Sequence, residues 1–111
     1  MTNRMLDTQD PCGAVLIALA DPTRRRIFEV LVHKPRSVAA VAQTVPVSRP
    51  AVSQHLRQLS DAGLVTVTKE GTRNIYAARR EGVEVLRRYL DGLWSDVLTA
   101  FAEHVELKEQ K

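Results

Sequence analysis

The 111-residue sequence lacks the features that mark several large classes of protein. Its one cysteine, Cys12, cannot form a disulfide within the chain, which agrees with a reducing compartment. No apolar run approaches the roughly 20 residues of a membrane span, and no basic segment followed by an apolar one begins the chain, as in a secretory signal. No Ser/His/Asp or Cys/His set, glycine-rich phosphate loop or close carboxylate pair stands at a usable spacing. We therefore predict a cytoplasmic protein that is not an enzyme and carries no cofactor.

Length and composition indicate one helix-rich domain. A chain of this size has room for one core, and its 44% hydrophobic and 26% charged residues are typical of a globular protein. The net charge of +3 is uneven: residues 48–80 carry +4, with six Lys or Arg against two Asp or Glu, whereas residues 81–111 carry −3. A phosphate backbone would therefore bind the middle of the chain.

The most informative segment is residues 48–59, which predicts a short helix with two different faces. Val52, Leu56 and Leu59 recur at spacings of four and three residues and form an apolar stripe, and Ser48 is a good N-cap. The opposite face carries amides, hydroxyls and cations but no acid, a set that suits the major groove of DNA. For this helix alone, an ordinary solvated face is an equally good interpretation.

A second short amphipathic helix is predicted before this segment, and it favours a DNA-binding face over an ordinary solvated face. Its apolar residues recur with helical spacing at Val38, Val41, Ala42 and Val45. Ser37 is its N-cap, and Pro46 disfavours helical geometry at the residue before it. About three residues, 45–47, then join the two helices, which is the spacing of a helix-turn-helix. Because both apolar stripes must share one core, the polar face of the second helix is expected to protrude.

Two further helices are predicted before this pair, each starting with an Asp-Pro signal at Asp10 and Asp21. The first has almost no polar face, so we expect it to be buried in the core or against a partner. The second runs to about Val32 and begins with three consecutive arginines, residues 24–26. For these arginines we favour a solvated face over contact with phosphate.

The segment after residue 63 predicts two strands and a long helix. Residues 64–68 and 73–78 are expected to form a hairpin with a turn at 69–72. Lys69 and Arg73 would lie near its tip, where they could reach a DNA backbone or minor groove. A hairpin after a helix-turn-helix is a winged helix, and the alternative is a plain surface hairpin. From about residue 82 to 107 apolar residues follow a helical spacing that one small core cannot easily absorb.

Pairing of the first and last helices across a two-fold axis would bury this excess of apolar residues. The expected interface residues are Val15, Leu16, Leu19, Leu90, Leu93, Trp94, Val97 and Phe101. Such a dimer would place two reading helices about 34 Å apart, which matches a palindromic site. The alternatives are that the apolar residues of the last helix form the core of a monomer or line a ligand pocket.

These motifs together resemble the ArsR-type (ArsR/SmtB) family of bacterial winged helix-turn-helix repressors. The similarity is carried by residues 18–27, 47–59, 62–65 and 71–76 and covers roughly residues 14–106. It implies a mostly α fold with a small β-hairpin, in the order α-α-α-α-β-β-α, that forms a homodimer through its first and last helices. The expected organisation is a flexible N-terminus at residues 1–9 and a domain at 10–107, with the reading helix at about 48–61, the wing at about 64–78 and the dimerisation helix at about 82–107.

The resemblance also implies double-stranded DNA as the partner, at a palindromic operator in the promoter of the protein's own gene, with repression of neighbouring genes. The positions expected to contact DNA are Ser48, Arg49, Ser53, Gln54, His55 and Arg57 on the reading helix and Lys69 and Arg73 on the wing.

One departure from the family concerns metals. Many members sense a metal through a Cys-x-Cys pair near the reading helix or through Asp, His and Glu on the last helix, but the only thiol here is Cys12. His104 has no second imidazole at the spacing of a zinc site, so we predict a regulator without a metal. Two alternatives stay open: a metal- or redox-responsive sensor using Cys12 and residues of the last helix, and a winged helix that binds an acidic protein.

Overall fold

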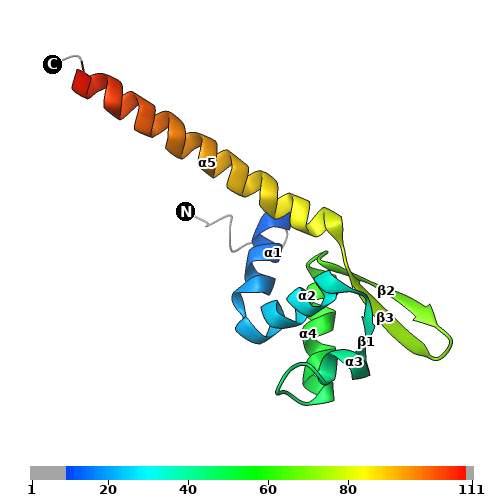
Figure 1. The fold of residues 1–111 in the computed structure, drawn as a ribbon. Coiled ribbons are helices and arrows are strands. Elements are labelled where there is room, and N and C mark those ends of the chain that lie inside the picture. The colour runs from blue at the N-terminus through cyan, green and yellow to red at the C-terminus, as the bar shows by residue number, and fades with distance from the viewer. Residues whose placement is uncertain (1–9, 110–111) are drawn as a thin grey trace.

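The computed structural model describes residues 10–109; the predicted flexible segment at 1–9 lies outside that range. The elements in chain order are α1 (Pro11–Ala20), α2 (Pro22–His33), β1 (Arg36–Ser37), α3 (Val38–Ala42), α4 (Arg49–Asp61), β2 (Val65–Glu70), β3 (Arg73–Ala78) and α5 (Arg80–Glu109). Figure 1 shows the first four helices gathered beside the hairpin, with α5 projecting from them. The predicted fold class, mostly α with a small hairpin in a winged helix-turn-helix, is confirmed.

The helix starts fall where the sequence predicts them. A side-chain oxygen accepts a hydrogen bond from the backbone N–H three residues later at each of Asp10, Asp21, Ser37 and Ser48, at 3.2, 2.9, 3.2 and 3.3 Å. These N-caps satisfy N–H groups that have no partner within the first turn of a helix.

Strand β1 is the element that the sequence analysis missed. Arg36 and Ser37 pair antiparallel with Tyr76 and Ile75, so β3 becomes the middle strand of a sheet with the order β1-β3-β2. Two residues are too short to show the alternation that marks a strand, and their extended conformation depends on a partner strand distant in the sequence. The observed order is therefore α-α-β-α-α-β-β-α.

Helix α3 is shorter than its apolar spacing suggests. It ends at Ala42, and residues 43–48 connect it to α4, so the connection is longer than the predicted three residues. Val45 lies outside the helix but is still buried, 8% exposed, because the loop carries it back into the core.

The core lies where α1, α2, α3 and α4 meet the start of the hairpin. Its fully buried side chains are Val15, Ile27, Leu31, Val41, Val52, Leu56, Leu59 and Leu64. The predicted apolar stripes of α3 and α4 supply several of them, so the two helices share one core as expected.

Helix α5 gives the molecule its elongated shape. Its 30 residues would span about 45 Å at 1.5 Å per residue. The molecule measures 70 × 32 × 24 Å and has a radius of gyration of 18.6 Å, against about 13 Å for a compact chain of this length. No helix among residues 10–109 combines the length and apolar character needed to span a bilayer.

Candidate DNA-binding surface

The reading helix α4 has the two faces that the sequence predicts. Val52, Leu56 and Leu59 are fully buried on its inner side. The exposed residues of the N-cap and outer face, before the acidic Asp61 at the last position, are Ser48, Arg49, Pro50, Ser53, Gln54, Arg57 and Gln58. This outer face therefore presents amide, hydroxyl and guanidinium groups to solvent over its whole length up to the last turn.

His55 is placed differently from the other residues predicted to contact DNA. At 100° per residue it lies beside Leu59, at the edge of the buried stripe, and it is half-buried. Its Nδ1 is buried and has no hydrogen-bond partner among the described residues. The pKa of Asp21 is lowered chiefly by the hydrogen bond from the Arg24 N–H, and His55 contributes to the same shift. His55 therefore borders the buried stripe and does not share the outer face of Gln54, which its spacing from Leu59 already indicates, and its contact with DNA stays a prediction.

The wing continues the surface of α4. Lys69 and Arg73 are both exposed near the tip, opposite Asn74 and Glu70 in the strand register. Gly71 turns the chain there with a φ of 64°, a conformation that glycine adopts without a steric cost.

A hollow of about 340 Å³ lies between α4 and the wing. It is lined by Ser53, Gln54, Arg57, Ser60, Asp61, Val67 and Tyr76. Ser60, Val67 and Tyr76 were not predicted to line this surface, because the approach of Val67 and Tyr76 to Ser60 and the rest of α4 depends on how the hairpin folds back. Val67 is 47% exposed although it alternates with the buried Val65, since β2 leaves the core after its first residue.

The arginine run at the start of α2 has a structural role that neither sequence interpretation anticipated. Arg24 donates from Nε to Ala18 O at 2.6 Å and from Nη2 to Ile17 O at 3.2 Å, and Arg25 donates to Leu19 O at 2.7 Å. These are carbonyls of the last turn of α1, which have no partner within the helix. Their cationic donors also suit the negative end of the helix dipole.

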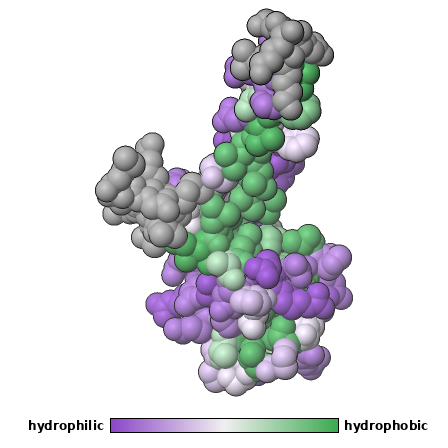
Figure 2. Space-filling view, turned by 90° about the vertical axis from the view of Figure 1, so that its left-hand side faces the viewer, coloured by the Kyte–Doolittle hydropathy of each residue, from purple (hydrophilic) through white to green (hydrophobic). Residues whose placement is uncertain are grey.

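Helix α5 exposes the apolar surface that the sequence predicts. Its large exposed apolar residues are Val83, Leu90, Leu93, Trp94, Val97, Leu98 and Phe101, and we call this set the apolar surface of α5. Figure 2 shows hydrophobic residues running along the projecting helix, between polar edges. An exposed apolar surface of this extent marks an interaction site. These residues are neither the core of this chain nor the lining of a closed pocket within it.

The first helix divides its apolar residues between the core and the surface. Leu16 and Leu19 are partly exposed, whereas Val15 is 1% exposed in the core. Val15 has no surface left for a partner, so its assignment to the dimer interface is corrected. The sequence could not separate these residues because α1 is apolar on every side.

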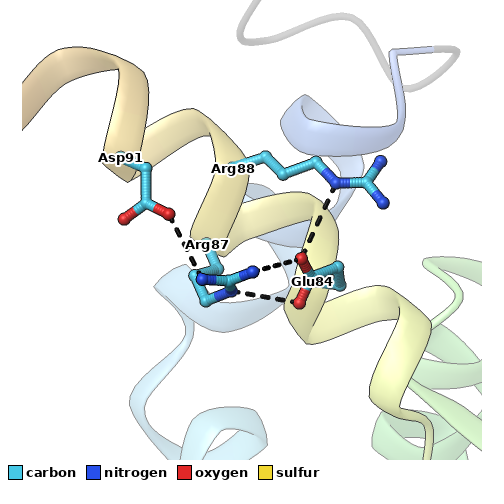
Figure 3. Close-up of polar contacts among 4 residues, drawn as sticks. All are labelled: Glu84, Arg87, Arg88 and Asp91. Carbon is cyan, nitrogen blue, oxygen red and sulfur yellow. Dashed lines mark hydrogen bonds and ion pairs between the residues drawn. The ribbon is translucent and has the colours of Figure 1, made fainter. Parts of the chain in front are cut away.

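A set of ion pairs borders the apolar surface of α5 (Figure 3). Arg87 contacts Glu84 at 2.6 Å and Asp91 at 3.4 Å, and Arg88 lies 3.7 Å from Glu84. The hydrogen bond from Arg87 lowers the pKa of Glu84 below its usual value. Exposed pairs of this kind add little to stability but fix side chains beside a surface that a partner can cover.

Cys12 lies buried at the start of α1. Burial, followed by the nearby charge of Asp10, raises the pKa of its thiol, which disfavours the reactive thiolate. Within residues 10–109, no group of three or more His, Cys, Asp or Glu side chains is arranged to hold a metal ion.

A helix-turn-helix with an exposed polar face, followed by a hairpin beside it, defines a winged-helix DNA-binding domain. Residues 19–68 match a family model described as a helix-turn-helix domain. The HTH-type transcriptional regulator Rv2034 of Mycobacterium tuberculosis is 47% identical over 89 residues, which cover 80% of this chain and 83% of that regulator.

Two solved structures extend the comparison. An ArsR-like transcriptional regulator from Rhodococcus sp. RHA1 matches with a TM-score of 0.79 and 29% identity, over 90% of this chain and 94% of that one. The homodimeric winged helix-turn-helix DNA-binding domain Mb0332 from Mycobacterium bovis, described as a possible ArsR-family regulator, matches with a TM-score of 0.63 and 30% identity, over 94% of this chain and 90% of that one. The chain belongs to the ArsR-type (ArsR/SmtB) family of transcriptional regulators. It is a DNA-binding regulator and not an enzyme, as predicted.

Proposed function

We propose that two copies of this chain bind a palindromic operator as a homodimer and repress transcription of their own gene and its neighbours. The observation that carries the proposal is the outer face of α4, which is exposed, polar and continuous with the cationic wing. In Figure 1, α4 and the hairpin lie away from the free end of α5, so DNA and a second subunit would use separate parts of the molecule. Repression is the activity that the family resemblance implies.

Each DNA-facing residue has a role that follows from its chemistry. Gln54 and Arg57, in the middle of the outer face, are suited to base edges in the major groove, where an amide pairs with adenine and a guanidinium with guanine. Ser48 and Arg49, at the helix N-terminus, are suited to phosphate oxygens. Arg73 and Lys69 on the wing would add sequence-independent contacts to the backbone.

The homodimer is supported by the apolar surface of α5. Full burial of one large apolar side chain contributes about 1.5–3 kcal/mol, so covering even part of this surface favours association. The similar Mycobacterium bovis domain is a homodimer. A two-fold arrangement would place the two copies of α4 about 34 Å apart, one turn of duplex DNA.

Fluorescence anisotropy with the purified protein tests this proposal. The duplexes are the region upstream of its own gene, a shuffled version of equal length, and fragments selected from random sequence. We expect the upstream region to bind at least about a thousandfold more tightly than the shuffled duplex at moderate salt, and the selected fragments to be palindromic. Equal affinity for the upstream and shuffled duplexes would refute sequence-specific regulation, and binding only to an acidic protein would favour the alternative module.

We also propose that DNA binding is not controlled by a bound metal. The support is the sequence, because Cys12 is the only thiol and residues 38–58 contain no cysteine. Native mass spectrometry with Zn²⁺, Cu⁺ and Ni²⁺ tests the proposal, and operator affinity is measured with and without each ion. A tight, stoichiometric metal that changes operator affinity would show that the regulator is a metal sensor.

A further inference from the structure

One side chain, Arg24, joins α1, α2 and the reading helix α4. Arg24, in the first turn of α2, donates from Nη1 to Oε1 of Gln58 on α4. The same guanidinium donates from Nε to Ala18 O and from Nη2 to Ile17 O at the end of α1. A guanidinium is planar and presents its donors in a fixed geometry, so the positions of its three acceptors are linked.

This bridge spans a hollow between α1 and α4. This hollow of about 200 Å³ lies between Ala14 and Ile17 of α1 and Asp61 and Ala62 at the end of α4, with Arg24 and Gln58 in its wall. Arg24 is half-buried there, unlike Arg25 and Arg26, which are exposed. Across this hollow, Arg24 of α2 connects the two helices by donating both to Gln58 of α4 and to the carbonyls of α1.

The bridge ends on the part of α4 that faces DNA. Gln58 lies one helical turn after Gln54 on the same face of α4, so the bridge connects this face of the helix to α2 and, through Arg24, to α1. At its other end the bridge holds α1, which packs against the first turns of α5. It therefore links the helix pair of the proposed subunit contact to the reading helix.

We propose that Arg24 is a positioning residue for operator recognition, which fixes the orientation of α4 relative to α1 and α5 through Gln58. This inference rests on the proposed dimer, because two reading helices must enter grooves about 34 Å apart at the same time. A small rotation of each α4 moves its outer face along the DNA. Loss of the bridge therefore broadens the range of half-site spacings that the dimer accepts.

The orientation of α4 is tested without DNA. Spin labels are placed on exposed positions of α4 and α5 by Ser53→Cys and Ser95→Cys in a Cys12→Ala background, and labelled chains are diluted with unlabelled protein so that only distances within one chain are measured. Gln58→Ala removes the bridge but leaves the α1 carbonyls capped. Arg25→Ala is the matched control, because Arg25 caps Leu19 O and makes no hydrogen bond to α4 among the described residues.

We expect a broader label-to-label distance distribution in Gln58→Ala and Arg24→Ala and an unchanged one in Arg25→Ala. Equal widths in Gln58→Ala and the parent protein would overturn the proposal. This result does not depend on DNA binding, so it stands apart from the test of the proposed function.

Operator recognition is tested with duplexes whose half-sites are moved by one or two base pairs. We expect Gln58→Ala to reduce the preference for the natural spacing by about twofold to tenfold, the effect of losing one hydrogen bond, while Arg25→Ala retains it. A variant that is merely less stable would lower all affinities equally and leave this ratio unchanged. A broadened distance distribution with an unaltered spacing preference would show that the bridge has no role in recognition. If the parent protein shows no operator preference, the proposed function fails, and with it the role in recognition.

Discussion

Individual side chains on the DNA-facing surface differ in what they can recognise. The amide of Gln54 offers a donor and an acceptor in one plane, which distinguishes one base pair from another. The guanidinium of Arg73, at the wing tip, offers charge to any phosphate. Substitution of the two residues is therefore expected to affect DNA binding in different ways.

Gln54→Ala is expected to lose about 1–3 kcal/mol of discrimination at one base pair of each half-site, because the amide no longer pairs with a base edge.

Arg73→Ala is expected to weaken binding to operator and random duplex alike. It should also reduce the slope of log affinity against log salt concentration by about one unit per subunit. Anisotropy titrations at several salt concentrations separate the two effects. Equal losses on both duplexes for Gln54→Ala would contradict its role in reading the sequence.

Asp21 predicts a pH dependence of folding. The N–H of Arg24 donates to its carboxylate at 2.9 Å, and this bond, with the charges of Arg24 and His55, holds the pKa of Asp21 below its usual value of 3.8. A group whose pKa is depressed in the folded state contributes stability that is present above the unfolded value and is lost as pH falls through the folded one. We expect Tm to fall as the pH is lowered below about 4.

Asp21→Asn provides the control, because asparagine is an equally good N-cap but does not titrate. The variant is expected to keep its helix and to show a shallower fall of Tm below about pH 4; Glu84, whose pKa is also lowered, maintains part of the slope. If Tm fell equally steeply with pH in the variant and the parent protein, Asp21 would not contribute to the pH dependence of stability.

At the scale of whole elements, helix starts were easier to predict than the ends and contacts of helices. The caps of α1, α2, α3 and α4 depend on residues within one turn, so the sequence shows them directly. Helix α4 ends at Asp61, which agrees with the expected range of about 48–61, and its end is also local: Gly63 takes a φ of 80° just after it, and Leu64 N donates back to Leu59 O at 3.0 Å. The early end of α3 and the pairing of β1 depend on distant partners, which local spacing does not show.

Helix α5 contains two glycines for which the same substitution has opposite expected effects. A Cβ on Gly82 would lie 2.4 Å from Gly63 O, because α5 passes directly over the α4–β2 connection, whereas a Cβ on Gly92 meets nothing within 4 Å. Gly82→Ala is expected to destabilise the fold by about 1–3 kcal/mol through overpacking. Gly92→Ala is expected to stabilise the helix by about 0.5–1 kcal/mol. Urea unfolding of both variants measures the change in the free energy of unfolding. A stabilising Gly82→Ala would contradict the close approach of α5 to Gly63.

For the whole molecule, the elongated shape follows from a helix that continues beyond its own core. The first turns of α5 pack against α1, and the rest exposes residues such as Trp94, 64% exposed, and Phe101, 65% exposed. A single subunit leaves this surface in water, so the shape itself favours association.

Phe101→Glu is expected to dissociate the dimer, because it would place a carboxylate in an apolar interface. The mass in solution should fall from twice 12.4 kDa to 12.4 kDa by sedimentation, and emission from Trp94, the single tryptophan, should shift to longer wavelength. Thr99→Glu, the same change on the polar side of α5, is the control and should remain dimeric. A parent protein of 12.4 kDa at micromolar concentration would contradict the dimer.

The helix starts, the apolar stripes of α3 and α4 and the polar outer face of the reading helix could be predicted from the amino-acid sequence, because each depends on residues within a turn or two of one another. The places of Val15 in the core and of Arg24 as the link between α1 and α4 became known from the folded chain alone. These placements depend on which elements pack side by side, and distances between segments far apart in the chain are fixed by packing and not by local spacing.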